Sequence, residues 1–263
     1  MTFIRSDVAN SISTLVAVLQ QGWALVASRT LPALGLTLAF AFVAYGVRAV
    51  TASGAIAGAA VTFMIFLAAG APGFLAVMMV FVLTTVATRF GYVRKQELGT
   101  AEPRAGRKAS QVLANLLAAA MVAAPAALYW RAQDALYIAM AAALAEAAAD
   151  TVSSEIGQAL RRPAYLITNL RSAPIGDNGG ISVAGSVAGI MAAVIIAFTC
   201  EWLRLVDFRG FLIATLAAIF GMFFDSLLGA TLERPGRLGN DSVNFLSTVF
   251  AACLALAAVL ILS

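Results

Sequence analysis

The stretch that decides the fold is residues 55–90, AIAGAAVTFMIFLAAGAPGFLAVMMVFVLTTVATRF, which contains no charged residue before Arg89. A helix needs about 20 apolar residues to cross the hydrocarbon core of a bilayer, so this stretch is long enough for two crossings. A Gly-Ala-Pro-Gly sequence begins at Gly70 near its middle, where a break in a membrane helix is tolerated. We therefore expect two spans, 55–70 and 72–90, that form a tight hairpin.

The rest of the chain has the same character. Of its 263 residues, 62% are hydrophobic and 11% are charged, and the mean hydropathy is +0.92. A soluble domain is about half apolar and a quarter charged, so the chain lies well outside that class. We expect an all-α fold, a polytopic transmembrane helical bundle of about seven or eight spans, which forms a single integral membrane domain over residues 1–263. The other expected spans are 31–50, 110–129, 134–157, 181–203, 209–232 and 242–262.

The first residues, 1–28, have a mixed pattern. Apolar segments around Ile12 and Trp23 are interrupted by polar residues such as Asn10 and Gln20. Two interpretations stay open: an interfacial amphipathic helix, which we favour, and an extra N-terminal span. The second would move the N-terminus to the other side of the membrane.

Basic residues gather in the expected loops 91–108, 158–180 and 233–241, which share one side of the membrane if the spans are as given above. The positive-inside rule places these loops in the cytoplasm. We therefore expect a protein of the bacterial inner membrane whose active site faces the cytoplasm. The net charge is only +4 and no long basic run is present, so nucleic acid is not an expected partner.

The chain contains no histidine. This absence excludes Ser-His-Asp and Cys-His nucleophile pairs, histidine-ligated metals and histidine general bases. Its two cysteines, Cys200 and Cys253, lie in apolar runs with no metal-binding spacing, so we expect structural roles for them. Any catalysis must therefore use carboxylates, amides, hydroxyls and basic side chains, with or without a hard metal ion.

Acidic residues inside the spans point to function, because an ionisable side chain in the hydrocarbon region is costly. At about 100° per residue, Glu146 and Asp150 share one helical face with Ser154, whereas Glu155 points elsewhere on an ideal helix. Asp225 lies within another apolar segment. Paired carboxylates suit Mg²⁺, which binds through one or two carboxylates and substrate phosphates. Two alternatives stay open: an ion or proton relay of a transporter, and carboxylates paired with Arg or Lys of another helix.

Three further groups of polar and small residues adjoin the same side of the membrane. The segment 174–182 carries glycines that expose backbone amides at the start of a helix, as a phosphate site requires. Its simpler interpretation is a helix N-cap at Asp177 or Asn178. The groups comprise Arg107, Lys108, Gln111 and Asn115; Asn178, Gly179, Gly180 and Ser182; and Asp225, Ser226, Asn240, Asp241 and Asn244.

These blocks, in this order, resemble the integral membrane family that includes plastid phytyl-phosphate kinase and many uncharacterised prokaryotic relatives. The family looks distantly related to the CTP-using phytol and dolichol kinases. Two positions depart from its pattern: Leu116 stands where a glycine is expected, and Asp177 where a small hydroxyl residue is expected. The blocks are Gly106-Arg107 with residues 111–115, Ala149-Asp150-Thr151 with residues 154–157, Gly176 with residues 178–182, residues 225–230, and Asn240-Asp241 with Asn244.

The resemblance implies a membrane kinase that transfers the γ-phosphoryl group of a nucleotide to a polyprenyl or phytyl monophosphate, giving the diphosphate. CTP is the expected donor, and the expected partners are nucleotide, an isoprenoid lipid and the bilayer. Asp150, Glu155 and Asp225 are the expected catalytic residues and the expected ligands of Mg²⁺. The expected substrate- and nucleotide-binding residues are Arg107, Lys108, Gln111, Asn115, Thr151, Ser154, Asn178, Gly179, Gly180, Ser182, Ser226, Asn240, Asp241 and Asn244.

Two other functions are compatible with these residues. A prenol kinase would act on the alcohol and would need an aspartate base near the hydroxyl. A transporter of ions or small solutes predicts polar residues spread across the bilayer or arranged in two repeated halves. The sequence shows no repeat, and its intramembrane acids gather on one side, which favours an enzyme with one-sided access.

Overall fold

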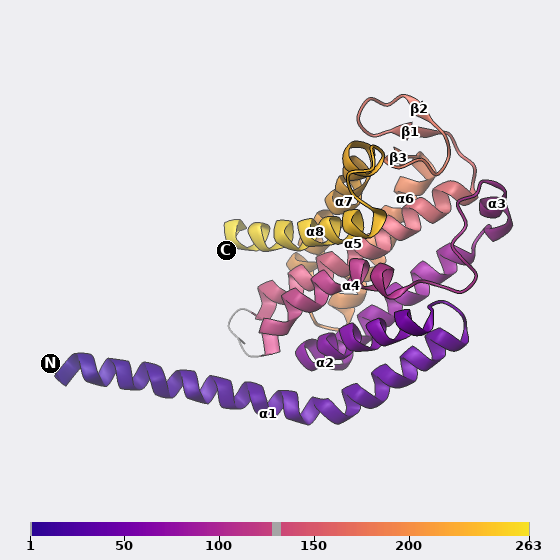
Figure 1. Ribbon diagram of the computed structural model, residues 1–263. Coiled ribbons are helices and arrows are strands. Elements are labelled where there is room, and N and C mark those ends of the chain that lie inside the picture. Colours follow the sequence, from indigo (N-terminus) through magenta and orange to yellow (C-terminus); the bar gives the residue numbers. More distant parts are fainter. Residues whose placement is uncertain (1, 128–132, 263) are drawn as a thin grey trace.

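The computed structural model describes residues 2–127 and 133–262, with side chains from residue 20 onward, and these residues are nearly all helical (Figure 1). The expected all-α, polytopic class is confirmed. Among the described residues, seven helices are long and apolar enough to cross a membrane. The helices are α1 (Thr2–Gly46), α2 (Ala52–Arg89), α3 (Tyr92–Glu97), α4 (Ala109–Ala123), the 3₁₀ turn η1 (Ala124–Ala127), α5 (Gln133–Ala159), α6 (Val183–Trp202), α7 (Phe208–Leu228), the π-helical turn η3 (Gly229–Glu233) and α8 (Asn240–Leu262).

The expected hairpin is present within α2. A straight helix of its 38 residues would be about 57 Å long. Arg107 nevertheless contacts both ends of α2: its carbonyl accepts from the backbone N–H of Thr51 at 3.0 Å, and its Nη2 donates to Thr88 Oγ1 at 3.3 Å. The chain reverses at Gly70, whose φ of 67° and ψ of −159° are not helical. The two arms of α2 therefore cross separately, and the seven helices make eight crossings.

A side chain of α1 completes the hairpin turn. The break at Gly70 leaves the last carbonyls of the first arm without helical partners. Arg29 Nη1 donates to the carbonyls of Leu67 and Ala68 at 3.0 and 2.7 Å, and the Tyr137 hydroxyl donates to Ala68 O at 2.8 Å. One arginine in an apolar helix is thus explained by the fold alone.

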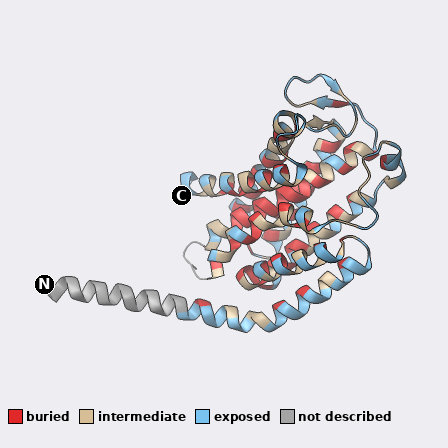
Figure 2. Cartoon of the chain, in the orientation of Figure 1, coloured by how far each residue is buried: buried red, intermediate tan, exposed pale blue. Residues whose placement is uncertain are grey.

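Helix α5 is the centre of the bundle, and Figure 2 shows the buried residues concentrated along it. Its run of alanines lets neighbouring helices approach closely, and glycines of α6 face it. A Cβ on Gly185 would lie 2.6 Å from Ser153 O, and a Cβ on Gly189 would lie 2.8 Å from Ala149 O. Only glycine permits this contact between α6 and the backbone of α5, as in close-packed membrane helices.

A small antiparallel sheet in the segment 160–182 adds to the expected architecture. Strand β1 (Ala164–Leu166) lies between β2 (Ser172–Ala173) and β3 (Gly180–Ile181). Tyr165 pairs with both Ser172 and Ile181. These strands are too short to be recognised from sequence, and they fix the turn that leads into α6.

The N-terminal boundaries differ from the expected ones. Helix α1 is continuous from Thr2 to Gly46, so the helix that contains the expected span 31–50 begins before residue 31 and ends at Gly46. The two interpretations of residues 1–28 stay predictions. The interfacial character expected for this region concerns side chains that lie largely outside those the structure describes. Helix α4 ends at Ala123, earlier than the expected 129, because Pro125 cannot continue it; residues 128–132 lie outside the described ranges.

Candidate active site

A polar cavity of about 240 Å³ opens at the end of the bundle that carries α3 and the small sheet. Residues of all three basic loops line it, so these loops share one end of the molecule, as expected. The cavity brings together most of the predicted site. The predicted residues that line it are Arg107, Gln111, Asn115, Asp150, Thr151, Ser154, Glu155, Asn178, Gly179, Gly180, Ser182, Asp225, Ser226, Asn240 and Asn244.

Two predicted residues, Lys108 and Asp241, do not line the polar cavity. Lys108 is exposed and immediately precedes α4. Asp241 lines a separate shallow pocket against α4. Asn240 and Asn244 are one helical turn apart and face the cavity, whereas Asp241 is rotated about 100° from Asn240. The structure therefore does not bring these two residues to the polar cavity, and their binding roles stay predictions.

Two carboxylates that line the cavity, Asp150 and Asp225, lie close to a third, the buried Glu146, which does not line it. Asp150 and Glu146 of α5 lie close enough to Asp225 of α7 for their charges to interact. Ser247 Oγ of α8 donates to Asp225 Oδ2 at 3.1 Å. Glu146 is 1% exposed, and neither of its oxygens has a hydrogen-bond partner among the described residues. A buried acid without a hydrogen-bond partner beside two other acids calls for a cation or a proton.

Arg107 supplies positive charge to this acidic group, since its guanidinium attracts Asp150. Glu233 at the end of η3 adds further negative charge close to Asp150 and Asp225. The charge of the site is therefore unbalanced in favour of the acids. Such a group fits a divalent cation better than it fits a bare phosphate.

The expected trio of metal ligands, Asp150, Glu155 and Asp225, is not assembled. In the described ranges, no group of three or more Asp, Glu or Cys side chains is placed to hold a metal ion. Asp150 and Asp225 do converge, and Mg²⁺ commonly takes only one or two carboxylates together with phosphate oxygens and waters. Asp150 and Asp225 therefore fit a cation whose remaining ligands are oxygens from outside the protein.

Glu155 is instead paired with Lys95, a residue that the sequence analysis counted only as a loop charge. Lys95 is 0% exposed, and its Nζ donates to Glu155 Oε2 and to the carbonyls of Thr88 at 2.6 Å and Ala87 at 3.2 Å. The alternative in which an intramembrane acid pairs with a lysine from another helix is thus correct for Glu155. The signal was its position, since it lies on a different helical face from Asp150 and needed another partner.

The glycine-rich loop, residues 174–182, is held against η3 by close backbone contact. Gly179 has a φ of +77°, and a Cβ there would lie 2.4 Å from Ala230 N. Ala230 belongs to η3, the π-helical turn directly after α7, and such turns are frequent at functional sites. The predicted N-cap at Asp177 or Asn178 is wrong, because Ser182 caps α6 by accepting from Gly185 N at 3.1 Å. The loop is therefore free of the capping role and lies beside Asp225.

Asp177, which departs from the family pattern, pairs with an arginine. Its Oδ2 lies 3.2 Å from Arg234 Nη2. This arginine follows η3, so the pair also ties the glycine-rich loop to the end of α7. The extra negative charge at the rim of the cavity is therefore compensated.

Arg107 is positioned by the segment before it. Gly106 has a φ of +86°, and a Cβ there would lie 2.5 Å from Val50 N. Val50 and Arg107 form a parallel β-bridge, which fixes the backbone of Arg107 beside the start of α2. The glycine of the Gly-Arg pair is therefore required for the position of the arginine.

Glu102 is a further cavity residue that the sequence analysis missed. Gln111 Nε2 donates to its two carboxylate oxygens at 3.2 and 3.4 Å. Glu102 lies in a loop with no periodicity, so no sequence signal marked it. It restrains Gln111 at the wall of the cavity.

Comparison with known proteins finds similarity to a family of integral membrane proteins and to individual membrane proteins. The model of the family described as integral membrane protein DUF92 matches residues 35–252. The uncharacterized membrane protein sll0875 of Synechocystis is 32% identical over 73% of this chain and 76% of its own length. The Arabidopsis protein VTE6, chloroplastic, is 30% identical over 80% of this chain and 65% of its own length.

A third protein is similar over a shorter part of this chain. The uncharacterized membrane protein MJ0933 of Methanocaldococcus jannaschii is 36% identical over 40% of this chain and 44% of its own length. The chain thus spans about three quarters of the Synechocystis relative and less than two thirds of the other two. No solved structure matches it.

Proposed function

We propose, from the premise that this chain belongs to the DUF92 family of integral membrane proteins, that it is a membrane-embedded kinase for isoprenoid monophosphates. It would transfer a phosphoryl group from a nucleoside triphosphate, CTP as the expected donor, and release the isoprenoid diphosphate. The observation that carries the proposal is the convergence of five separate sequence blocks on one polar cavity containing Asp150, Asp225, Arg107 and the glycine-rich loop. The isoprenoid substrate rests on the resemblance to the family that includes plastid phytyl-phosphate kinase.

The chemistry suits a site without histidine. Phosphoryl transfer depends on positioning and charge neutralisation, with little covalent work for the protein. An oxygen of the acceptor monophosphate forms a bond to the γ-phosphorus, while the bond from that phosphorus to the β–γ bridging oxygen breaks and the nucleoside diphosphate leaves. A phosphate acceptor is already anionic near neutral pH, so the step needs no strong general base.

Each part of the cavity has a distinct task in this proposal. The backbone amides of Gly179 and Gly180 would bind the donor phosphates, as exposed amides at a helix entry do. Arg107 would orient the acceptor phosphate opposite them. Asp150 and Asp225 would hold Mg²⁺, which when bound neutralises charge on the phosphate oxygens.

The membrane orientation belongs to the same proposal. The basic loops and the cavity lie at one end of the bundle, and the positive-inside rule assigns that end to the cytoplasm, where nucleotide is available. In a bacterium the protein would lie in the inner membrane. Labelling of single cysteines introduced at exposed positions of loop 233–241, in intact and in permeabilised cells, tests this orientation.

The direct test uses the purified protein in detergent with labelled CTP or ATP, Mg²⁺, and either phytyl monophosphate or phytol. The proposal expects labelled diphosphate from the monophosphate alone. Product from phytol alone would establish the prenol kinase instead. No turnover with any acceptor, together with solute flux in proteoliposomes, would establish a transporter.

A matched pair of variants ties the activity to the cavity. Asp225→Asn removes a carboxylate that lines the site, whereas Asp241→Asn makes the same change at an acid outside it. The first variant is expected to be inactive and the second to retain activity within about twofold. Equal activity in both variants would contradict the assignment of the cavity as the active site.

A further inference from the structure

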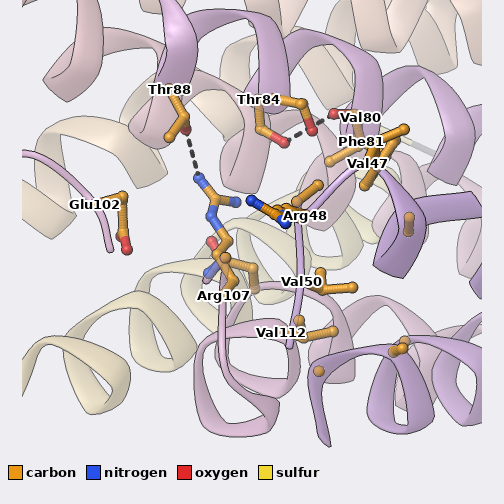
Figure 3. Close-up of a pocket in the computed structure, with 18 of the residues that line it drawn as sticks. Val47, Arg48, Val50, Val80, Phe81, Thr84, Thr88, Glu102, Arg107 and Val112 are labelled. Atoms are coloured by element: carbon orange, nitrogen blue, oxygen red, sulfur yellow. Dashed lines mark hydrogen bonds between the residues drawn. The ribbon is translucent and has the colours of Figure 1, made fainter. Parts of the chain in front are cut away.

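A second, larger cavity of about 500 Å³ lies between α1, the two arms of α2, and α4 (Figure 3). Its walls are mostly apolar, and it differs in this from the polar cavity. The apolar side chains that line it include Phe40, Ala44, Val50, Val80, Phe81 and Val112. Its volume lies within the range of about 300–1,000 Å³ that is usual for small-molecule sites.

The two cavities adjoin each other. Glu102, Arg107 and Asn115 line both of them. Arg107 therefore lies between the two cavities. The acids and the glycine-rich loop are on one side of it, and the apolar cavity is on the other. Its Nη2 donates to Thr88 Oγ1, so the guanidinium is held at this junction (Figure 3).

The end of the apolar cavity near Arg107 is positively charged. Arg48 lines the cavity, and its side chain points toward that of Arg107 (Figure 3). The ion pairs among the described residues join Lys95 with Glu155, Arg161 with Glu97, and Arg234 with Asp177, so neither Arg48 nor Arg107 is paired with a carboxylate. Glu102 lines the same end of the cavity, and Asp150 attracts Arg107 from the polar side, but neither carboxylate forms an ion pair with Arg48 or Arg107. Two converging guanidinium groups that are not in an ion pair favour an anion between them.

We infer that the apolar cavity holds the hydrocarbon chain of the acceptor, with its monophosphate between Arg48 and Arg107. This inference rests on the proposed function. It adds where the acceptor binds and which features of the acceptor the protein selects. The ligand chemistry follows from the two features that meet at Arg107: an anion site and an apolar chamber continuous with it. An amphiphile with one anionic end and a branched hydrocarbon tail satisfies both.

The outer wall of the cavity borders the membrane. Helix α1 packs almost entirely against α2, and its other face exposes large apolar side chains such as Phe42 and Val43. Phe40 and Ala44, on the same helix, line the cavity. The tail therefore enters from the bilayer beside α1 while the phosphate stays at the membrane surface. Each buried methylene group contributes about fourfold in affinity, so burial of about three or four of the carbons that a C20 tail has beyond a C5 tail is enough for about 100-fold tighter binding of the C20 monophosphate.

A glycine in the cavity wall allows a direct test. Gly58 lines the cavity, and a Cβ there would meet only Val112 Cγ1, at 3.8 Å. Gly58→Leu therefore fills the chamber without a backbone clash. Gly35→Leu makes the same change on exposed α1, where a Cβ would meet nothing within 4 Å, and serves as the matched control.

The first measurement is independent of turnover. A C20 monophosphate with a photoreactive diazirine on its tail is crosslinked to the full-length protein in detergent, and the labelled peptides are identified by mass spectrometry. We expect labels on the segments that line the chamber, competed by phytyl monophosphate but not by phosphatidic acid. Gly58→Leu should reduce the labelling at least tenfold, and Gly35→Leu should leave it within twofold. Labels on lipid-exposed faces that acceptor does not compete would overturn the inference.

The second measurement uses the head-group end, in case Gly58→Leu fails to fold. Arg48→Gln should weaken binding of the C20 monophosphate about tenfold and leave the KM for CTP unchanged. Arg237→Gln, an exposed arginine that lines neither cavity, should change neither value. Turnover with labels outside the chamber would refute only the present inference. Specific labels in the chamber without turnover would refute the kinase and leave the acceptor site.

Discussion

Asp150 and Glu155 are carboxylates at the same end of the same helix, and their surroundings differ. Asp150 lies beside a second acid, Asp225, and is attracted by the guanidinium of Arg107, which lines the same cavity. Glu155 is paired with a fully buried lysine, Lys95, whose other contacts are two backbone carbonyls. An acid in a membrane helix is therefore not functional by burial alone. The groups that face it decide whether it binds a ligand or holds two helices together.

The largest effect is expected from Asp150→Asn, which should lower phosphoryl transfer by about 10³-fold, a loss typical of a removed electrostatic contact in an active site. The side chain keeps its shape, and one of three mutually repelling charges disappears, so the fold should persist. Turnover and thermal unfolding in detergent are measured together. If the variant keeps more than a tenth of the activity, Asp150 does not have the catalytic role that distinguishes it here from Glu155.

The second-largest effect is a loss of folding stability, and it involves Glu155. Lys95→Met leaves the buried Glu155 without its partner and should cost about 3–5 kcal/mol, because an uncompensated charge remains in the interior. Denaturant unfolding in mixed micelles provides the measurement. A loss below about 1 kcal/mol would show that the pair does not stabilise the contact between α3 and α5.

The double variant Lys95→Met/Glu155→Met then separates the two roles of Glu155. Replacing both partners of a buried ion pair by apolar residues is often neutral, so stability should return close to that of the unmodified protein. Activity should return with it if Glu155 only holds α3. A stable but inactive double variant would restore Glu155 to the catalytic role that the sequence suggested.

The smallest effect is expected at the rim, where Asp177 and Arg234 form a partly exposed pair. Arg234→Gln should cost no more than about 1 kcal/mol, since solvent and salt screen such pairs. The KM for nucleotide should rise less than about threefold. A larger rise would show that compensation of Asp177 is needed for donor binding, and this carboxylate would then resemble Asp150 more than Glu155.

The predictions from the sequence were correct for features that depend on residues close together in the chain. Hydropathy alone indicates the spans, and the glycine at position 70 correctly predicted the reversal within α2, because apolar length and backbone freedom act locally. The predictions missed features that neighbours in space decide. Lys95 was counted as a loop charge, although it is buried, and Asp241 was placed in the site, although the helix turns it away.

The small sheet and Glu102 were missed for a related reason. Strands of two or three residues have too few side chains to show alternation. Glu102 belongs to a loop without periodicity, and its role becomes visible only when Gln111 of another element reaches it. Neither carries a local signal.

Composition and residue order alone were enough to predict a polytopic helical membrane protein, a site without histidine, and polar blocks gathered at one end. These properties follow from apolar length, residue type and the distribution of loop charges. Only the tertiary structure decided that Asp150 and Asp225 share a cavity while Glu155 pairs with Lys95. It alone placed Arg107 between a polar and an apolar chamber. Such facts depend on glycine-permitted contacts between distant helices, which no single segment encodes.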